Sequence, residues 1–154
     1  MAALTLVSQN LGAQNVARAE QSAWEALKSG TIWMTLMGVG FIIWREPLVL
    51  LFTNDATVIP PAEMCLVFIA LGQPFLSVAM ILGQALRGAG DIRATLVVTF
   101  IGIWLVRVAV GYILGIVLGL GLFGMWIGWL ADFGARSVLM YTRFQAGKWK
   151  TLKI

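Results

Sequence analysis

Two long apolar runs meet at a short, charged, glycine-rich segment, and this arrangement restricts the chain to a membrane protein. The run Met64–Leu86 holds 23 residues without a charge. A helix of that length extends about 35 Å, enough to cross the hydrocarbon core of a bilayer. A second run begins at Ala94, directly after the segment Arg87–Arg93. Because a soluble protein could not keep both runs out of water, we expect this segment to be a turn at a membrane surface.

The composition of the 154-residue chain supports an all-α integral membrane protein. Hydrophobic residues make up 60% and charged residues 12%, whereas an ordinary soluble domain is about 25% charged. Cys65 is the single cysteine and there is no histidine, which excludes an internal disulfide, a Cys/His metal site and a histidine general base. No GK[ST] follows Gly88 and Gly90, as a phosphate-binding loop would require. We therefore expect no enzyme and no bound cofactor or metal.

Hydropathy along the chain predicts about four complete transmembrane helices after one partial helix. The partial helix covers residues 1–11, and residues 12–29 form a turn that leads into an amphipathic helix start. The expected spanning segments end at Trp44, Leu86, Leu118 and Phe144. Residues 145–154 form a basic C-terminal tail, which we expect to fray.

The distribution of lysine and arginine predicts one orientation for every segment. The turn at 12–29 holds two basic residues, the 87–93 loop two and the C-terminal stretch 143–154 four, whereas the turn at 45–61 holds one and that at 119–124 none. The positive-inside rule then places the first turn, the 87–93 loop and the C-terminus in the cytoplasm. Basic residues next to apolar helices point to anionic lipid as a partner and not to nucleic acid.

Four stretches, in this order, resemble multidrug and toxin extrusion (MATE) transporters. Leu6–Asn15 is similar to the end of the second helix of a repeat, and Leu51–Ile59 to the external "FT-x-D" segment of the family. Leu86–Arg93 resembles its "RGxGDTR" loop, with Ile92 in place of threonine. Gly119–Trp126 and Arg143–Trp149 resemble its last hairpin.

The resemblance implies half of a two-lobe, twelve-helix transporter. Residues 1–154 would supply the C-terminal lobe, from the end of helix 8 through helices 9–12, and the N-terminal lobe would be missing. It also implies a multi-pass protein of the cell membrane. The implied function is secondary antiport of organic, mainly cationic, xenobiotics against H⁺ or Na⁺, with this chain inactive by itself. Two alternatives stay open, a small self-assembling transporter and a membrane scaffold subunit.

Arg107 and Asp132 are the ionisable residues that lie deepest in expected helices. A central arginine costs roughly 2.5–3.5 kcal/mol to insert. The two residues are centred on the Gly119–Gly121 turn, each about 18 Å of helix from it, so an antiparallel hairpin would bring them to one depth. We expect them to interact, either as a switch facing the transport cavity or as a structural pair.

Gln73, Ser77 and Gln84 form a polar stripe on the helix before the loop. Their offsets of 0, 4 and 11 place them on one face. Such a stripe is expected to face protein or water, either lining a cavity for amphipathic cations or forming interhelical hydrogen bonds. Some sodium-coupled MATE members have an acid in the middle of this helix, and none is present here, so the coupling ion stays open between H⁺ and Na⁺.

A ladder of small residues, Gly111, Gly115 and Gly119, is followed by Gly124 and Gly128. Small residues at this spacing let two helix backbones approach closely. We expect ordinary packing within the bundle here in preference to a dimer interface.

Overall fold

The computed structural model describes residues 2–151, and in this range the chain is built from helices joined by short turns. The fold class predicted from the sequence, an all-α membrane protein, is confirmed. The elements are α1 (Ala2–Gly12), α2 (Val16–Ile43), α3 (Arg45–Leu50), α4 (Ile59–Gly88), α5 (Ile92–Phe100), η1 (Ile101–Val108), α6 (Ala109–Tyr112), η2 (Ile113–Val117), α7 (Gly121–Gln145) and η3 (Lys148–Thr151).

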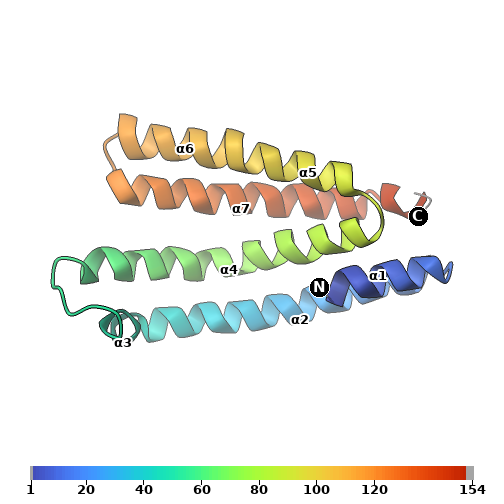
Figure 1. The fold of residues 1–154 in the computed structure, drawn as a ribbon, viewed down its shortest axis with the longest axis horizontal. Coiled ribbons are helices and arrows are strands. Elements are labelled where there is room, and N and C mark those ends of the chain that lie inside the picture. The colour runs from blue at the N-terminus through green and yellow to red at the C-terminus, as the bar shows by residue number, and fades with distance from the viewer. Residues whose placement is uncertain (1, 152–154) are drawn as a thin grey trace.

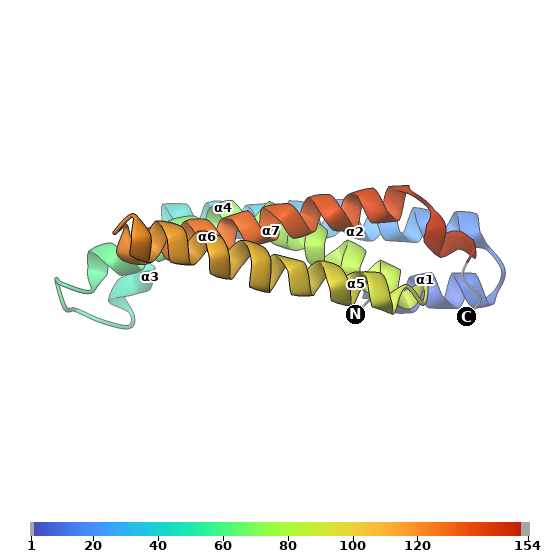
Figure 2. The ribbon, with the colours of Figure 1, turned by 90° about the horizontal axis from the view of Figure 1, so that it is seen from above.

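The long helices lie side by side and antiparallel, so the molecule is elongated along their axes (Figures 1 and 2). The helix α4 packs between α2 and α7, and α7 also packs along the length of η1, α6 and η2. The segments α5, η1, α6 and η2 follow one another without a break, as one long rod over residues 92–117. This rod and α7 form the C-terminal hairpin.

Within residues 2–151, three helices are long and apolar enough to cross a membrane, namely Val16–Ile43, Ile59–Gly88 and Ile92–Val117. The fourth expected span, α7, has 25 residues, about 37 Å of helix, but Asp132 and Arg136 lower its hydropathy. Large apolar side chains stay exposed on these rods: Trp33 is 69% exposed and Leu105 63%. Such side chains are stable only against lipid or another protein surface.

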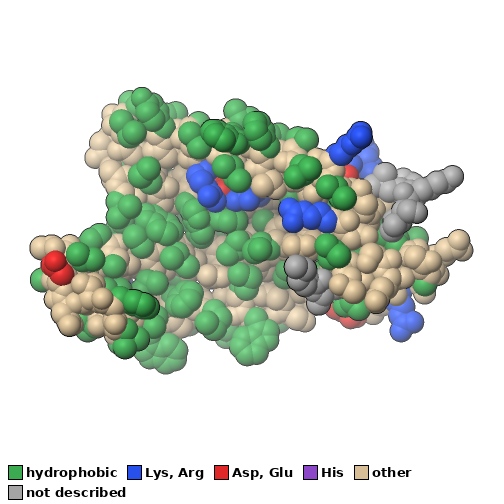
Figure 3. All heavy atoms as spheres, viewed as in Figure 1, with side chains coloured by type: hydrophobic (Ala, Val, Ile, Leu, Met, Phe, Trp, Pro, Cys, Tyr) green, Lys and Arg blue, Asp and Glu red, His purple; other side chains and the backbone are tan. Residues whose placement is uncertain are grey.

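The three segments predicted to share one side of the membrane do lie at one end of the bundle. The turn between α1 and α2, the turn between α4 and α5, and the C-terminal segment gather there (Figure 1). The loop before α4 and the turn before α7 lie at the opposite end. Figure 3 shows lysine and arginine side chains between the middle of the molecule and the end at which the α1–α2 turn, the α4–α5 turn and the C-terminal segment gather. We call that end of the bundle the basic end.

Helix starts in the chain follow local capping chemistry. Asn15 precedes α2 and accepts a hydrogen bond from the backbone N–H of Arg18 at 3.1 Å. Before α4, the exposed Asp55 accepts bonds from the hydroxyl and the backbone N–H of Thr57 at 2.7 and 2.8 Å, which lower the pKa of its carboxyl group. Two prolines, Pro60 and Pro61, then occupy the first turn of α4, where a missing N–H costs nothing.

The expectation of a frayed tail is wrong for the part of the tail that the structure describes. Trp149 is fully buried, stacks on Phe144 with ring centroids 4.9 Å apart, and donates its indole N–H to the Phe144 carbonyl at 2.9 Å. Lys150 pairs with Glu20 of α2 at 2.6 Å. A buried tryptophan with a satisfied N–H outweighs the tendency of charged residues to fray. Residues 152–154 lie outside the described range.

Glycines let the two arms of the C-terminal hairpin approach to backbone contact. A Cβ atom added at Gly124 would come within 2.5 Å of the Gly115 backbone nitrogen, and one at Gly128 within 2.7 Å of the Gly111 nitrogen. Four of these glycines, Gly111, Gly115, Gly124 and Gly128, therefore pack within the bundle, as expected, whereas Gly119 lies at the turn with no atom within 4 Å of an added Cβ. By contrast, Gly134 on the same helix has no such neighbour within 4 Å.

We predict that Gly124→Ala lowers the free energy of unfolding by about 1–3 kcal/mol, because the methyl group must push two backbones apart. Gly134→Ala is the matched control, and it should be neutral or raise stability by up to about 1 kcal/mol through its better helix propensity. Equilibrium unfolding in mixed detergent micelles, followed by circular dichroism, measures both values. Equal losses for the two variants would show that the hairpin is not closely packed.

Candidate functional site

One buried carboxylate joins the two arms of the C-terminal hairpin. Asp132 of α7 is fully buried, and its Oδ2 lies 2.6 Å from a guanidinium nitrogen of Arg107 and 2.6 Å from one of Arg136. Arg107 comes from η1, and Arg136 lies one turn after Asp132 on α7. The structure thus brings together the two residues that the hairpin geometry predicted to meet, and it adds a second arginine. We call these three residues the triad.

The triad carries an excess of one positive charge in an apolar setting. The side chain of Arg136 is 13% exposed and that of Arg107 34%. The ring of Phe133 lies near both guanidinium groups, with its centroid 5.4 Å from the guanidinium carbon of Arg107 and 4.4 Å from that of Arg136. The negative face of an aromatic ring attracts cations, so Phe133 supplements the single carboxylate.

A glycine makes room for the buried carboxylate. A Cβ atom at Gly102 would collide with Oδ1 of Asp132 and with the Arg136 side chain, so only glycine fits at that point of η1. Three atoms of the triad are buried without a hydrogen-bond partner among the described residues: Oδ1 of Asp132 and the Nε atoms of both arginines. Such unsatisfied groups are costly, and they mark a place where a further polar group would bind favourably.

The backbone around Arg107 is a π-helix, Ile101–Val108. π-Helical turns are rare and occur often at functional sites. Hydropathy patterns cannot reveal them, and the sequence analysis missed this one. It also left Arg136 out of the candidate pair, although its spacing from Asp132, four residues along one helix, is the spacing at which side chains meet.

An apolar cavity of about 420 Å³ lies next to Arg107, between the two arms of the hairpin. Aromatic rings of Tyr112, Trp126 and Trp129 line it. The positively charged triad at its border disfavours a cation inside this cavity.

The polar stripe on α4 divides between two neighbours. Ser77 is fully buried, and its hydroxyl lies 2.7 Å from that of Thr31 on α2, a hydrogen bond between helices. Gln73 is 8% exposed and packs at Gly38 of α2, where an added Cβ would come within 3.2 Å of the Gln73 Cγ. The positions of Gln73 and Ser77 fit the interhelical interpretation of the stripe.

Gln84 points to a different set of neighbours. It is half-buried and lines a cavity of about 140 Å³, together with Arg87, Thr99 and Arg136. This cavity lies between α4, α5 and α7 and reaches the triad through Arg136. Among the described residues, no group of three or more Asp, Glu, Cys or His side chains could hold a metal ion.

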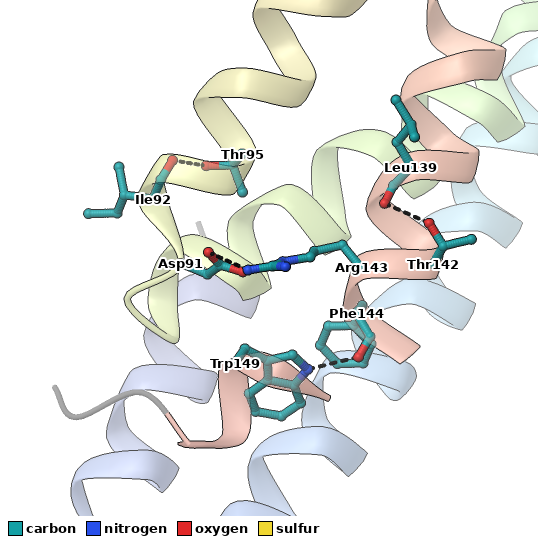
Figure 4. Close-up of polar contacts among 8 residues, drawn as sticks. All are labelled: Asp91, Ile92, Thr95, Leu139, Thr142, Arg143, Phe144 and Trp149. Carbon is teal, nitrogen blue, oxygen red and sulfur yellow. Dashed lines mark hydrogen bonds and ion pairs between the residues drawn. The ribbon is translucent and has the colours of Figure 1, made fainter. Parts of the chain in front are cut away.

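The loop between α4 and α5 is fixed by a second ion pair, which the sequence analysis missed. Asp91 is 5% exposed and accepts hydrogen bonds from Arg143 of α7 at 2.8 and 3.3 Å (Figure 4). As Figure 4 shows, this pair bridges the start of α5 and the end of α7, where Trp149 donates its indole N–H to the Phe144 carbonyl. Nothing in the sequence spacing connects residues 91 and 143, because they meet only when the rod and α7 lie side by side.

We predict that Asp132→Asn destabilises the protein more than loss of either arginine of the triad. The asparagine variant leaves two like charges, a largely buried one on Arg136 and a partly exposed one on Arg107, without an anion, a loss of about 3 kcal/mol. Arg107→Gln and Arg136→Gln each leave a neutral one-to-one pair and should cost less. The free energies of unfolding of the three variants give this order. An arginine variant as unstable as Asp132→Asn would contradict a shared carboxylate.

Comparison with known proteins places the chain among membrane transporters. The family model MatE matches residues 1–113. The chain is 34% identical over 119 residues to the probable multidrug resistance protein NorM of Thermotoga maritima, covering 77% of this chain and 26% of that protein. It is 34% identical over 147 residues to the multidrug resistance protein MdtK of Proteus mirabilis, covering 93% of this chain and 32% of that protein.

The chain also matches a relative whose name does not mention drug resistance. The uncharacterized transporter YisQ of Bacillus subtilis is 33% identical over 107 residues, which cover 70% of this chain and 24% of that protein. The chain therefore spans about a quarter to a third of the length of these curated relatives. With its apolar helices and the match over residues 1–113, this chain is a multi-pass membrane protein that belongs to the MatE family.

Proposed function

We propose that this chain forms the C-terminal lobe of a secondary multidrug antiporter. The transporter would export organic, mainly cationic, compounds in exchange for H⁺ or Na⁺. The observation that carries this proposal is the alignment of 93% of the chain with a multidrug resistance protein three times its length. The transport cavity would then lie between this lobe and an N-terminal lobe, and the two lobes would alternate access by rocking against each other.

The basic end would face the cytoplasm. Arg18, Arg87, Arg93, Arg143 and Lys148 belong to the segments that gather there, whereas Arg45 is the basic residue of the loop region at the other end. The positive-inside rule orients such a bundle with its basic end inward. The membrane is the cell membrane in this proposal.

The carboxylate that carries the coupling ion would lie in the N-terminal lobe. In the described part of the chain, Asp132 is the one acidic residue that lies midway along an arm of the C-terminal hairpin. Its Oδ2 already contacts two arginines, and the excess charge of the triad repels a further cation. No Asp or Glu occurs in Met64–Leu86 either. This lobe would therefore supply rigid cavity walls and a conformational pivot, with the triad as the pivot.

Of the candidate cavity residues, Gln73 and Ser77 are buried against α2 and would hold α4 to that helix. In this proposal they would not line the transport cavity. In this proposal Gln84 links α4 to the triad through the small cavity that Arg136 also lines.

The test is a chimera in which this chain replaces the matching C-terminal segment of the Proteus mirabilis relative. Cells lacking their own efflux pumps would express the chimera, the isolated chain or the relative, and loss of a fluorescent cationic dye would be measured. We expect the chimera to export the dye and the isolated chain to export none.

A chimera with Asp132→Asn and one with Gly134→Ala serve as matched controls, the first expected to lose efflux and the second to retain it. Efflux by the isolated chain would contradict the proposal and favour a self-assembling small transporter. A chimera that reaches the membrane in normal amounts but exports nothing would favour a non-transport role.

A further inference from the structure

Among the described residues, a small cavity between α4, α5 and α7 is lined by two arginines and by no acidic side chain. Its volume is about 140 Å³, and the three helices that enclose it pack against one another (Figures 1 and 2). The polar lining consists of Gln84, Arg87, Thr99 and Arg136, and apolar side chains such as Phe133 complete the wall. A cavity with cationic donors, an apolar wall and no carboxylate favours an anion.

Helical spacing brings the lining side chains together. Gln84 and Arg87 are three residues apart on α4, and Phe133 and Arg136 are three residues apart on α7. At this spacing two side chains share one face of a helix. The two faces meet because α4 packs against α7. The cavity therefore follows from a local sequence pattern on each helix and from the register between the helices.

The positive charges around the cavity are not balanced. Within the triad one carboxylate serves two arginines, which leaves one positive charge in excess. Arg87 adds a second, because it has no ion-pair partner within residues 2–151. Asp91, the next acidic residue along the chain, is held by Arg143 at 2.8 Å. An anion between the two unbalanced charges lowers the electrostatic energy of this region.

Unsatisfied hydrogen-bond donors lie at the same place. The side chain of Arg136 is 13% exposed, and its Nε is buried without a hydrogen-bond partner. The side chains of Gln84 and Arg87 also make no hydrogen bond to the part of the chain that the structure describes. Thr99 offers no proton, since its hydroxyl donates to the Thr95 carbonyl at 2.8 Å. Unsatisfied donors of this kind favour a ligand that accepts hydrogen bonds.

The size of the cavity restricts the ligand to a small ion. Pockets for drug-sized compounds measure about 300–1,000 Å³, whereas a single water molecule needs about 10–15 Å³. A volume of about 140 Å³ therefore accepts an inorganic anion with part of its water shell and excludes an acyl chain or an aromatic compound. Arg87 lies in the last turn of α4 and is exposed, which gives an ion a route from the water at the basic end.

We propose that this cavity binds one chloride-sized inorganic anion. The guanidinium groups of Arg87 and Arg136 and the amide group of Gln84 would surround the ion. The bound anion would connect α4 to α7 and offset the excess charge of the triad. This site goes beyond the proposed antiport function and does not depend on it.

The test is the linewidth of the chloride nuclear magnetic resonance signal in the presence of the full chain in mixed micelles. Sodium chloride replaces sodium gluconate at constant ionic strength, so that general screening does not change. We expect a saturable broadening of the signal. Arg87→Gln should weaken chloride binding at least about tenfold, because a hydrogen bond to a charged group is lost. Gln84→Leu, which removes a neutral donor, should weaken it about threefold.

The matched control is Arg93→Gln, which removes the same charge from an exposed position outside the cavity. It should change the affinity less than about twofold, since solvent screens an exposed charge. Arg87→Lys keeps the charge and should retain binding, and equal helix content by circular dichroism checks that all variants fold. Equal losses in Arg87→Gln and Arg93→Gln would overturn the proposal. The absence of saturable broadening would overturn it as well, and would mean that the cavity holds water alone.

Discussion

The rest of the structure depends on how the chain places one carboxylate, Asp132, among helices whose outer surfaces are apolar. In a bilayer an isolated arginine or aspartate is costly, so a buried charge must have a partner at the same depth. Arg107 and Arg136 provide two partners for one oxygen atom. This arrangement connects the rod at 92–117 to α7 and fixes the register of the hairpin. It also gives the middle of the hairpin an excess of positive charge, which disfavours a further cation nearby.

Close packing of the hairpin makes the triad possible. Gly111 and Gly115 lie against Gly128 and Gly124, and Gly102 leaves the space that the Asp132 carboxylate occupies. A larger side chain at Gly102, Gly124 or Gly128 would collide with the other arm and move Arg107 away from the carboxylate. At the basic end the Asp91–Arg143 pair connects the same two arms a second time. Ion pairs at two levels and the close glycine contacts therefore hold the two arms of the hairpin together.

The helical bundle could be predicted from the sequence, because apolar length and charge asymmetry decide which segments cross a membrane. The contact between Arg107 and Asp132 could also be predicted from the sequence, because the glycine turn lies midway between these two residues. Other features depend on three-dimensional contacts that no local pattern encodes. Asp91 meets Arg143 across 52 positions, the backbone widens into a π-helix at Arg107, and Trp149 folds back onto Phe144. Gln73 and Ser77 lie on the predicted common face, but the hydrogen bond to Thr31 shows what that face contacts.

The most direct test of the shared carboxylate is a double-mutant cycle between Arg107→Gln and Asp132→Asn, read as free energies of unfolding in the same micelles. In the native background Arg107→Gln removes an ion pair and should destabilise the protein. In the Asp132→Asn background the same change removes repulsion between Arg107 and Arg136, so it should be neutral or stabilising, with a coupling of about 2 kcal/mol. Additive effects within about 0.5 kcal/mol would contradict the account, because they would mean that Arg107 and Asp132 do not interact.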